Sequence, residues 1–127
     1  RRIVSADTAR KLRQIMETVI TGGHAPDAAV EGWRVGGKTG TAEAPAEDGK
    51  GFDGFTTSFV GMAPIEDPQY VVGVLMQRPE GAVTEIGTTG TFSKIMQKVL
   101  EYYRVPHSTT SAQKLDKFAP GDPQNDD

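Results

Sequence analysis

One short stretch, residues 32–43, holds the side chains best suited to chemistry, and it satisfies two motifs at once. Gly32 to Thr39 is a literal G-x-x-x-x-G-K-T, the pattern of a loop whose backbone N–H groups and lysine hold nucleotide phosphates. Lys38 to Gly40 is also K-T-G, a triplet of acyl-transfer sites built around a serine. The first motif must open a helix, whereas the second lies on a strand. The flanking residues therefore decide between them.

The flanks argue against nucleotide binding. Downstream, Pro45, Gly49 and Gly51 break any helix, because proline removes a backbone donor and an interior glycine costs about 1 kcal/mol. Upstream, a polar loop from Thr21 to Gly32 replaces the buried strand that must precede a phosphate-binding loop. We therefore interpret the nucleotide motif as a coincidence of short patterns.

Hydrophobic periodicity predicts a helix on each side of the motif. The first begins after Ser5, a good N-cap, and stops at Gly22. The second runs from about Thr91 to Tyr103. The apolar stripe of the first helix comprises Ala9, Leu12, Ile15, Met16, Val19 and Ile20.

Three strands are predicted between these helices, at residues 33–42, 55–63 and 70–77. The third is nearly continuously apolar, which is typical of a central strand covered on both faces. Short connections favour an antiparallel meander. The predicted fold class is α+β, with an antiparallel sheet flanked by helices. Glycines in a strand indicate close approach by a ligand or another backbone, and the motif strand has Gly36, Gly37 and Gly40.

Composition narrows the function further. The chain has 127 residues, enough for one domain or part of one. Its net charge is −3 and its cationic residues are scattered along the sequence, so no nucleic acid partner is expected. It contains no cysteine and only two histidines, and we expect neither a metal nor a cofactor. Residues 1–106 are predicted to form the folded portion and the polar residues 107–127 a disordered tail.

The motif and its flanks resemble a known family. Val35 to Glu43 is similar to the K-T-G strand of class B (monofunctional) penicillin-binding proteins, and Phe59 to Pro64 resembles their next strand, aromatic-x-G-x-x-P. The resemblance extends over about residues 3–105. It implies the C-terminal part of a serine β-lactamase or D,D-transpeptidase-like fold.

Two motifs of that family are not in their usual place. S-x-N is absent, and the one S-x-x-K, Ser111 to Lys114, lies after K-T-G in the polar tail. A nucleophilic serine needs its activating base held rigidly within hydrogen-bond reach, so Ser111 is a poor candidate. We expect the nucleophile on an upstream segment of a longer protein, and this chain alone to be inactive.

The resemblance also implies roles for the motif residues. Lys38 and Thr41 would be catalytic: Lys38 through a fixed positive charge, and Thr41 through a backbone N–H that stabilises the oxyanion. Thr39, Gly40 and Thr41 would bind the substrate, because the two hydroxyls hold its carboxylate and the glycine keeps the strand edge bare. The substrate would add to this edge like an extra strand.

The implied function is a peptidoglycan D,D-transpeptidase that binds D-Ala-D-Ala stem peptides and β-lactams through an acyl-serine intermediate. The alternative is a non-catalytic domain of the same fold that senses penicillin. The implied partners are the upstream segment and a membrane glycosyltransferase of the division or elongation machinery. The implied location is the extracytoplasmic face of the cell membrane, with the anchor in the upstream segment.

Overall fold

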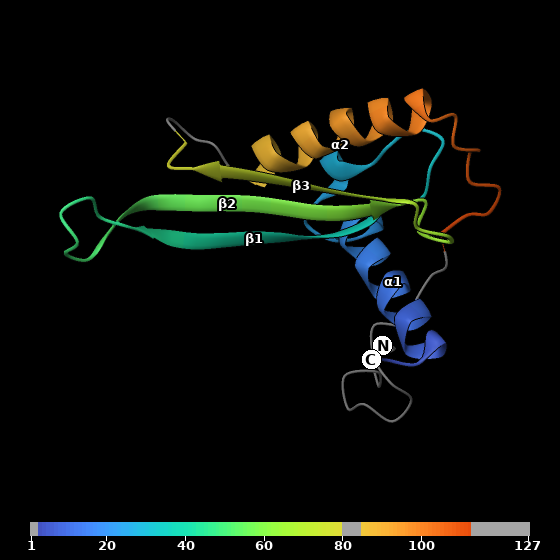
Figure 1. Ribbon diagram of the computed structural model, residues 1–127, viewed down its shortest axis with the longest axis horizontal. Helices are drawn as coiled ribbons and strands as arrows, with labels where there is room; N and C mark the ends of the chain where they lie inside the picture. Colours follow the sequence, from blue (N-terminus) through green and yellow to red (C-terminus); the bar gives the residue numbers. More distant parts are fainter. Residues whose placement is uncertain (1–2, 80–84, 113–127) are drawn as a thin grey trace, which may run out of the picture.

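A computed structural model describes residues 3–79 and 85–112 of the chain. Its elements are α1 (Ala6–Thr21), the 3-10 turn η1 (Pro26–Ala28), β1 (Gly36–Pro45), β2 (Phe52–Ala63), β3 (Tyr70–Gln77) and α2 (Glu85–Tyr102). The strands form one antiparallel sheet in the order β1-β2-β3, and α2 lies along one face of it (Figure 1). The predicted α+β fold with an antiparallel meander is confirmed.

The core lies between α2 and the sheet. Phe92, Met96 and Leu100 follow one face of α2 and have no exposed surface. The ring of Phe92 meets that of Phe59 on β2 edge to face, with centroids 4.7 Å apart. Further buried members of this cluster are Ile20, Ala25, Ala28, Val30, Trp33, Val35, Ala63 and Val105.

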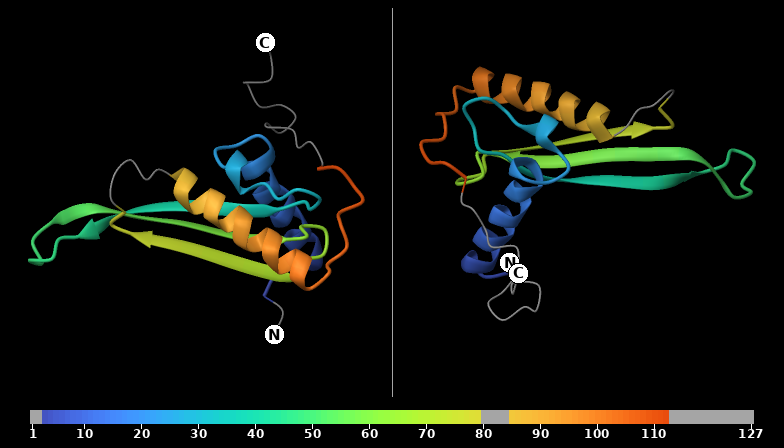
Figure 2. Two further views of the ribbon diagram at one scale, coloured as in Figure 1. Left: turned by 90° about the horizontal axis from the view of Figure 1, so that it is seen from above. Right: turned by 180° about the vertical axis from the view of Figure 1, so that it is seen from behind.

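The first helix projects away from the sheet near the start of β1 (Figures 1 and 2). Its predicted N-cap is confirmed, because the Ser5 hydroxyl accepts from the Thr8 N–H at 3.1 Å. Its predicted apolar stripe is only partly buried: Leu12 and Ile15 are 49% and 54% exposed. In that part of α1 the buried residue is instead a charged one, Glu17.

The second helix begins earlier than predicted, at Glu85 instead of about Thr91. Thr88 and Thr89, expected in the connection before the helix, lie inside it and are buried. Glycine-rich residues lower helix propensity, but burial of the first turns against the sheet outweighs that local preference.

The prediction that residues 70–77 form a central strand covered on both faces is wrong for the described chain. β3 is the last strand of the sheet, and β2 is the central one. Val72 and Val74 pack on the core, whereas Val71 and Leu75 on the opposite face are 66% and 70% exposed. A continuous apolar run cannot show how many neighbours a strand has.

Lys38 and Thr39, which end the nucleotide-binding pattern, lie inside β1, so the pattern is not a phosphate-binding loop. No helix begins at Lys38, because the strand runs from Gly36 to Pro45, starting later and ending later than the predicted residues 33–42. Beyond an irregularity between Glu43 and Pro45, the β1–β2 hairpin extends well past α2 (Figure 2).

The first residues after Pro106 contact the folded body, where the sequence predicts a disordered tail. The rings of His107 and Trp33 meet edge to face, with their centroids 4.3 Å apart. The Ser108 N–H donates to the Gly32 carbonyl at 2.9 Å. The Trp33 indole N–H donates to the Pro106 carbonyl at 3.0 Å. Residues 113–127 lie outside the described residues, and the division of the chain at residue 106 stays a prediction.

Candidate active site

The backbone of β1 alternates between its partner strand and an open edge. The Arg78 N–H donates to the Phe55 carbonyl at 2.9 Å, so odd-numbered residues of β2 direct their backbone groups toward β3. Even-numbered residues of β2 consequently face β1, where their partners are Gly36, Lys38, Gly40 and Ala42. The N–H and C=O groups of Gly37, Thr39 and Thr41 therefore point outward, to an edge with no neighbouring strand among the described residues.

The ammonium group of Lys38 lies at this outer edge. Lys38 stands opposite Val60, on the face of the sheet that α2 does not cover. Its exposed side chain bends around the edge, and Nζ donates to the Thr39 carbonyl at 2.9 Å and to Thr39 Oγ1 at 3.3 Å. A positive charge thus lies beside outward-facing backbone groups, which is an arrangement suited to an anionic ligand.

The two motif threonines share the other face of the sheet, as strand parity predicts. Thr39 stands opposite Phe59 and Thr41 opposite Thr57, and both partners are buried beneath α2. Thr39 is half-buried and Thr41 is exposed. Lys38 and Thr39 are joined directly by the hydrogen bonds above, and Thr41 lies one strand repeat further along the same edge.

The motif glycines are closely approached, but mainly by side chains of this chain, and the closest approach by another backbone is that of the Val60 carbonyl to Gly37. A Cβ on Gly40 would lie 2.7 Å from the Ser58 hydroxyl, and one on Gly37 would lie 2.8 Å from the Val60 carbonyl and also overlap the Phe59 ring. A Cβ on Gly36 would overlap the Ile65 side chain. Gly37 therefore needs glycine for packing, whereas a side chain at Gly36 or Gly40 would require the Ile65 or Ser58 side chain to move.

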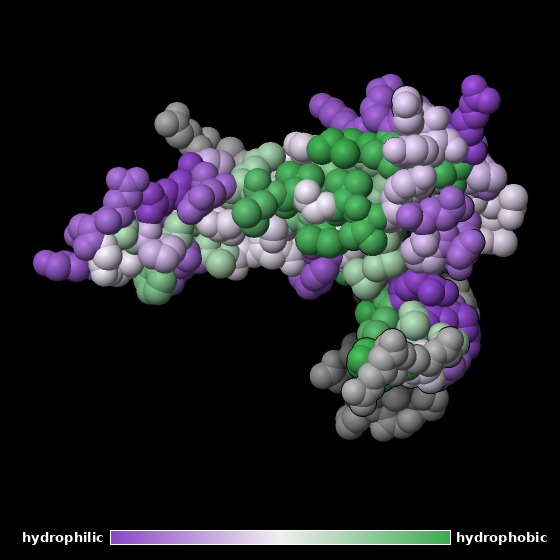
Figure 3. All heavy atoms as spheres, in the orientation of Figure 1, coloured by the Kyte–Doolittle hydropathy of each residue, from purple (hydrophilic) through white to green (hydrophobic). Residues whose placement is uncertain are grey.

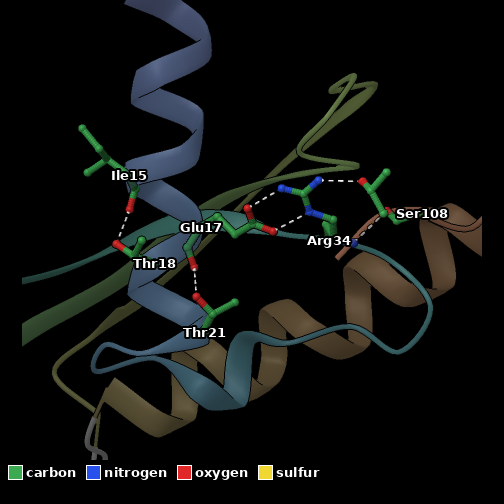
Figure 4. Close-up of polar contacts among 7 residues, drawn as sticks. Ile15, Glu17, Thr18, Thr21, Arg34 and Ser108 are labelled. Carbon is green, nitrogen blue, oxygen red and sulfur yellow. Dashed lines mark hydrogen bonds and ion pairs between the residues drawn. The ribbon is translucent and has the colours of Figure 1, made fainter. Parts of the chain in front are cut away.

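An ion pair that sequence reasoning missed holds the start of the motif strand (Figure 4). Arg34 Nε donates to Glu17 Oε1 at 2.7 Å, and Nη2 donates to Oε2 at 2.6 Å. The side chains are only 17% and 3% exposed. The hydrogen-bonded Glu17 carboxylate raises the pKa of Arg34 above its ordinary value, so the guanidinium stays charged. Glu17 lies beside the apolar stripe of the helix and not within it, so the helical pattern gave no signal for this pair.

Arg34 also joins two further segments immediately before the motif. Its carbonyl accepts from the Ile65 N–H at 2.8 Å, in the turn between β2 and β3. Its N–H donates to Ser108 Oγ at 2.9 Å, and Nη1 donates to Thr110 Oγ1 at 2.8 Å. The start of the strand is thus fixed to α1, to this turn and to the C-terminal segment.

The sequence predicts that Ser111 is a poor candidate for the nucleophile. Ser111 is exposed in the segment after Thr110. Gln113 and Lys114, which complete its S-x-x-K, lie outside the described residues. Within the described ranges, no helix combines the length and apolar character needed to cross a membrane.

Comparison with known sequences gives matches over most of the chain. A family model described as "Penicillin binding protein transpeptidase domain" matches residues 1–97. Stage V sporulation protein D of Bacillus subtilis is 40% identical over 89 residues, which are 69% of this chain and 14% of that protein. Penicillin-binding protein PbpB of Mycolicibacterium smegmatis is 36% identical over 121 residues, 84% of this chain and 18% of that protein. The chain therefore corresponds to a small part of these relatives.

Solved structures agree with the sequence matches. The transpeptidase domain of penicillin-binding protein 3 from Burkholderia pseudomallei superposes with a TM-score of 0.75 at 38% identity, covering 87% of this chain and 34% of that one. The D,D-transpeptidase domain of a peptidoglycan glycosyltransferase from Eggerthella lenta gives a TM-score of 0.66 at 35% identity, covering 79% and 21%.

Proposed function

Because the chain belongs to the penicillin-binding protein transpeptidase family, with the fold of its transpeptidase domains, we propose that it supplies the K-T-G strand of a serine D,D-transpeptidase that cross-links peptidoglycan. The observation that carries this proposal is the outer edge of β1. There the outward backbone groups of Thr39 and Thr41 lie beside the ammonium of Lys38. An extended peptide or a β-lactam adds to such an edge as a further strand.

Each motif residue has a distinct role in this proposal. The attacking serine gives its proton to its base and adds to the carbonyl carbon of the D-Ala-D-Ala bond, so that negative charge develops on the carbonyl oxygen. The peptide bond then breaks, the terminal D-alanine leaves with a proton on its nitrogen, and the acyl-serine remains. The outward N–H of Thr41 stabilises that oxyanion, as a donor already aimed at the edge before reaction. The hydroxyls of Thr39 and Thr41 and the charge of Lys38 hold the carboxylate of the terminal D-alanine.

The serine and its base come from another segment of the protein in this proposal. Two features support a missing partner segment. β3 has no outer neighbour among the described strands. Large apolar side chains are also exposed, among them Val71 and Leu75 on β3 and Ile95 on α2. Figure 3 shows a hydrophobic patch over β3 and the adjoining side of α2. Exposed patches of this kind mark sites of further packing.

The wider setting follows from the same proposal. The substrate is the peptidoglycan stem peptide, and β-lactams are the inhibitors, which makes the protein an antibiotic target. The protein acts at the extracytoplasmic face of the cell membrane, anchored by its upstream segment. There it works with a membrane glycosyltransferase of the division or elongation machinery.

Labelling with a fluorescent penicillin tests the proposal. The label is applied to this chain alone, to the upstream segment alone and to the two mixed, and it is followed by gel fluorescence and peptide mapping. We expect no label on this chain alone. With both pieces present, we expect label on the upstream piece only, because the acylated serine lies there.

Two outcomes of this experiment would contradict the proposal. Covalent label on Ser111 would place the nucleophile on this chain, and a Ser111→Ala variant separates that result from nonspecific labelling. Absence of label from the full-length protein, treated in parallel with the pieces, would contradict the proposed β-lactam site. Release of D-alanine from a pentapeptide substrate then distinguishes an enzyme from a sensor that binds penicillin without turnover.

A further inference from the structure

Thr57 carries a buried hydroxyl that the fold itself does not use. It lies on the central strand β2, opposite Thr41 on one side and Met76 on the other. The residue is only 4% exposed, and its Oγ1 has no hydrogen-bond partner among the described residues. Buried polar groups are nearly always hydrogen-bonded, because leaving one without a partner destabilises the folded state.

Packing alone does not explain a threonine at this position. The neighbour two residues along the same face, Phe59, is fully buried and apolar, and Met76 lies across the β2–β3 pair. Valine has nearly the same shape as threonine and β-propensity of the same kind, without a hydroxyl to desolvate. The hydroxyl therefore requires an explanation outside the hydrophobic core.

The register brings this hydroxyl next to the proposed substrate edge. Because the even-numbered residues of β1 exchange hydrogen bonds with β2, the Thr41–Thr57 pair is of the non-hydrogen-bonded type, with Cα atoms about 4.5 Å apart and side chains close together. Cross-strand threonine pairs of this kind can hydrogen-bond through their hydroxyls. Thr57 thus lies immediately behind Thr41, on the side away from the open edge.

We propose that Thr57 is a positioning residue for the ligand's carboxylate and acts through Thr41, an inference that rests on the proposed function. A carboxylate only accepts hydrogen bonds, so the Thr41 hydroxyl must donate to it. Oxygen Oγ1 of Thr41 then accepts from the Thr57 O–H, which directs the Thr41 proton outward. The two hydroxyls then form a short chain of hydrogen bonds that ends on the anion.

Substitutions at Thr57 in the full-length protein test this inference. Thr57→Val removes the hydroxyl at constant shape, Thr57→Ser keeps it, and Thr56→Val is the matched control, since Thr56 points to the opposite face. The measurements are the second-order rate constant of acylation by a penicillin, the same rate constant with its methyl ester, and the thermal unfolding midpoint.

We expect Thr57→Val to leave the unfolding midpoint unchanged or to raise it. Acylation by the free acid should be about tenfold slower, because the variant lacks one hydrogen bond of a chain that ends on a charged group. The methyl ester, which lacks the anion, should react equally with the wild type and Thr57→Val. Thr57→Ser and Thr56→Val should behave as the wild type.

Two results would overturn the role of Thr57 while leaving the proposed function intact. One is unchanged acylation in Thr57→Val, and the other is an equal loss with acid and ester, which indicates a packing defect. If Thr57→Val does not fold, Thr57→Ala gives the same comparison in a smaller side chain. A wild-type protein that no penicillin acylates instead contradicts the proposed function itself.

Discussion

The strand that carries K-T-G is held in opposite ways along its length. Just before the strand, Arg34 is joined to α1, to the β2–β3 turn and to the C-terminal segment. The first two residues of the strand, Gly36 and Gly37, are buried. From Lys38 to Thr41 the strand has β2 on one side only, and its outer edge is open among the described residues. Rigid support at one end leaves an exposed edge in a defined position, which is what a preorganised binding site requires.

The largest effect is expected from the anchored end. Arg34→Met leaves the Glu17 carboxylate buried without its partner, and removal of one member of a buried pair costs about 3–5 kcal/mol. The free energy of unfolding is measured by urea denaturation of the full-length protein. A double variant, Glu17→Met with Arg34→Met, should recover part of the loss, because no buried charge remains. Losses below about 1 kcal/mol in the single variant would show that the pair is not an anchor.

A substitution at the open edge should lower activity and leave the free energy of unfolding nearly unchanged. Lys38→Met removes an exposed charge, and we expect the free energy of unfolding to change by no more than about 0.5 kcal/mol. The rate of penicillin acylation should fall about 100-fold, the scale expected for loss of an electrostatic contact in the reacting site. If Lys38→Met instead lowered stability strongly and left acylation unchanged, the proposed contrast between the anchored start of the strand and its open edge would be wrong.

Backbone packing offers a smaller test of the same contrast. Gly37→Ala places a Cβ against the Phe59 ring and the Val60 carbonyl, and overpacking of this kind costs about 1–3 kcal/mol. Gly73→Ala is the matched control on β3, because its Cβ would meet only Val60 Cγ2, at an ordinary 3.7 Å. We expect thermal unfolding to shift down for the first variant and to stay within a degree or two for the second.

The exposed start of α1 should give the smallest effect. Hydrogen bonds from Lys11 and then Arg10 lower the pKa of Asp7. A carboxyl whose pKa is lowered by folding contributes stability above its unfolded pKa, about 3.9, and loses it as pH falls through the folded value. Asp7→Asn should therefore lower the unfolding midpoint slightly at pH 6 and leave it unchanged near pH 2. An equal difference at both pH values would exclude this titration as the cause.

Much of the fold was predictable because its signals are local. Ser5 caps α1 and residues 70–77 form β3 as the patterns predict, since a capping residue and a short apolar run are both recognised from neighbours in sequence. The family was also predictable, because the motif and its flanks are contiguous. The early start of α2 was not, since contact between its first turns and the sheet outweighs local propensity.

The candidate site divides in the same way. The sequence by itself determined that Lys38, Thr39, Gly40 and Thr41 lie together on one strand, with the two threonines on one face, because side-chain direction alternates along any strand. Only the tertiary structure decided which backbone groups reach the open edge, that Glu17 is buried against Arg34, and that Thr57 lies behind Thr41. These features depend on strand register and on contacts between residues far apart in sequence, and neither is encoded in a local pattern.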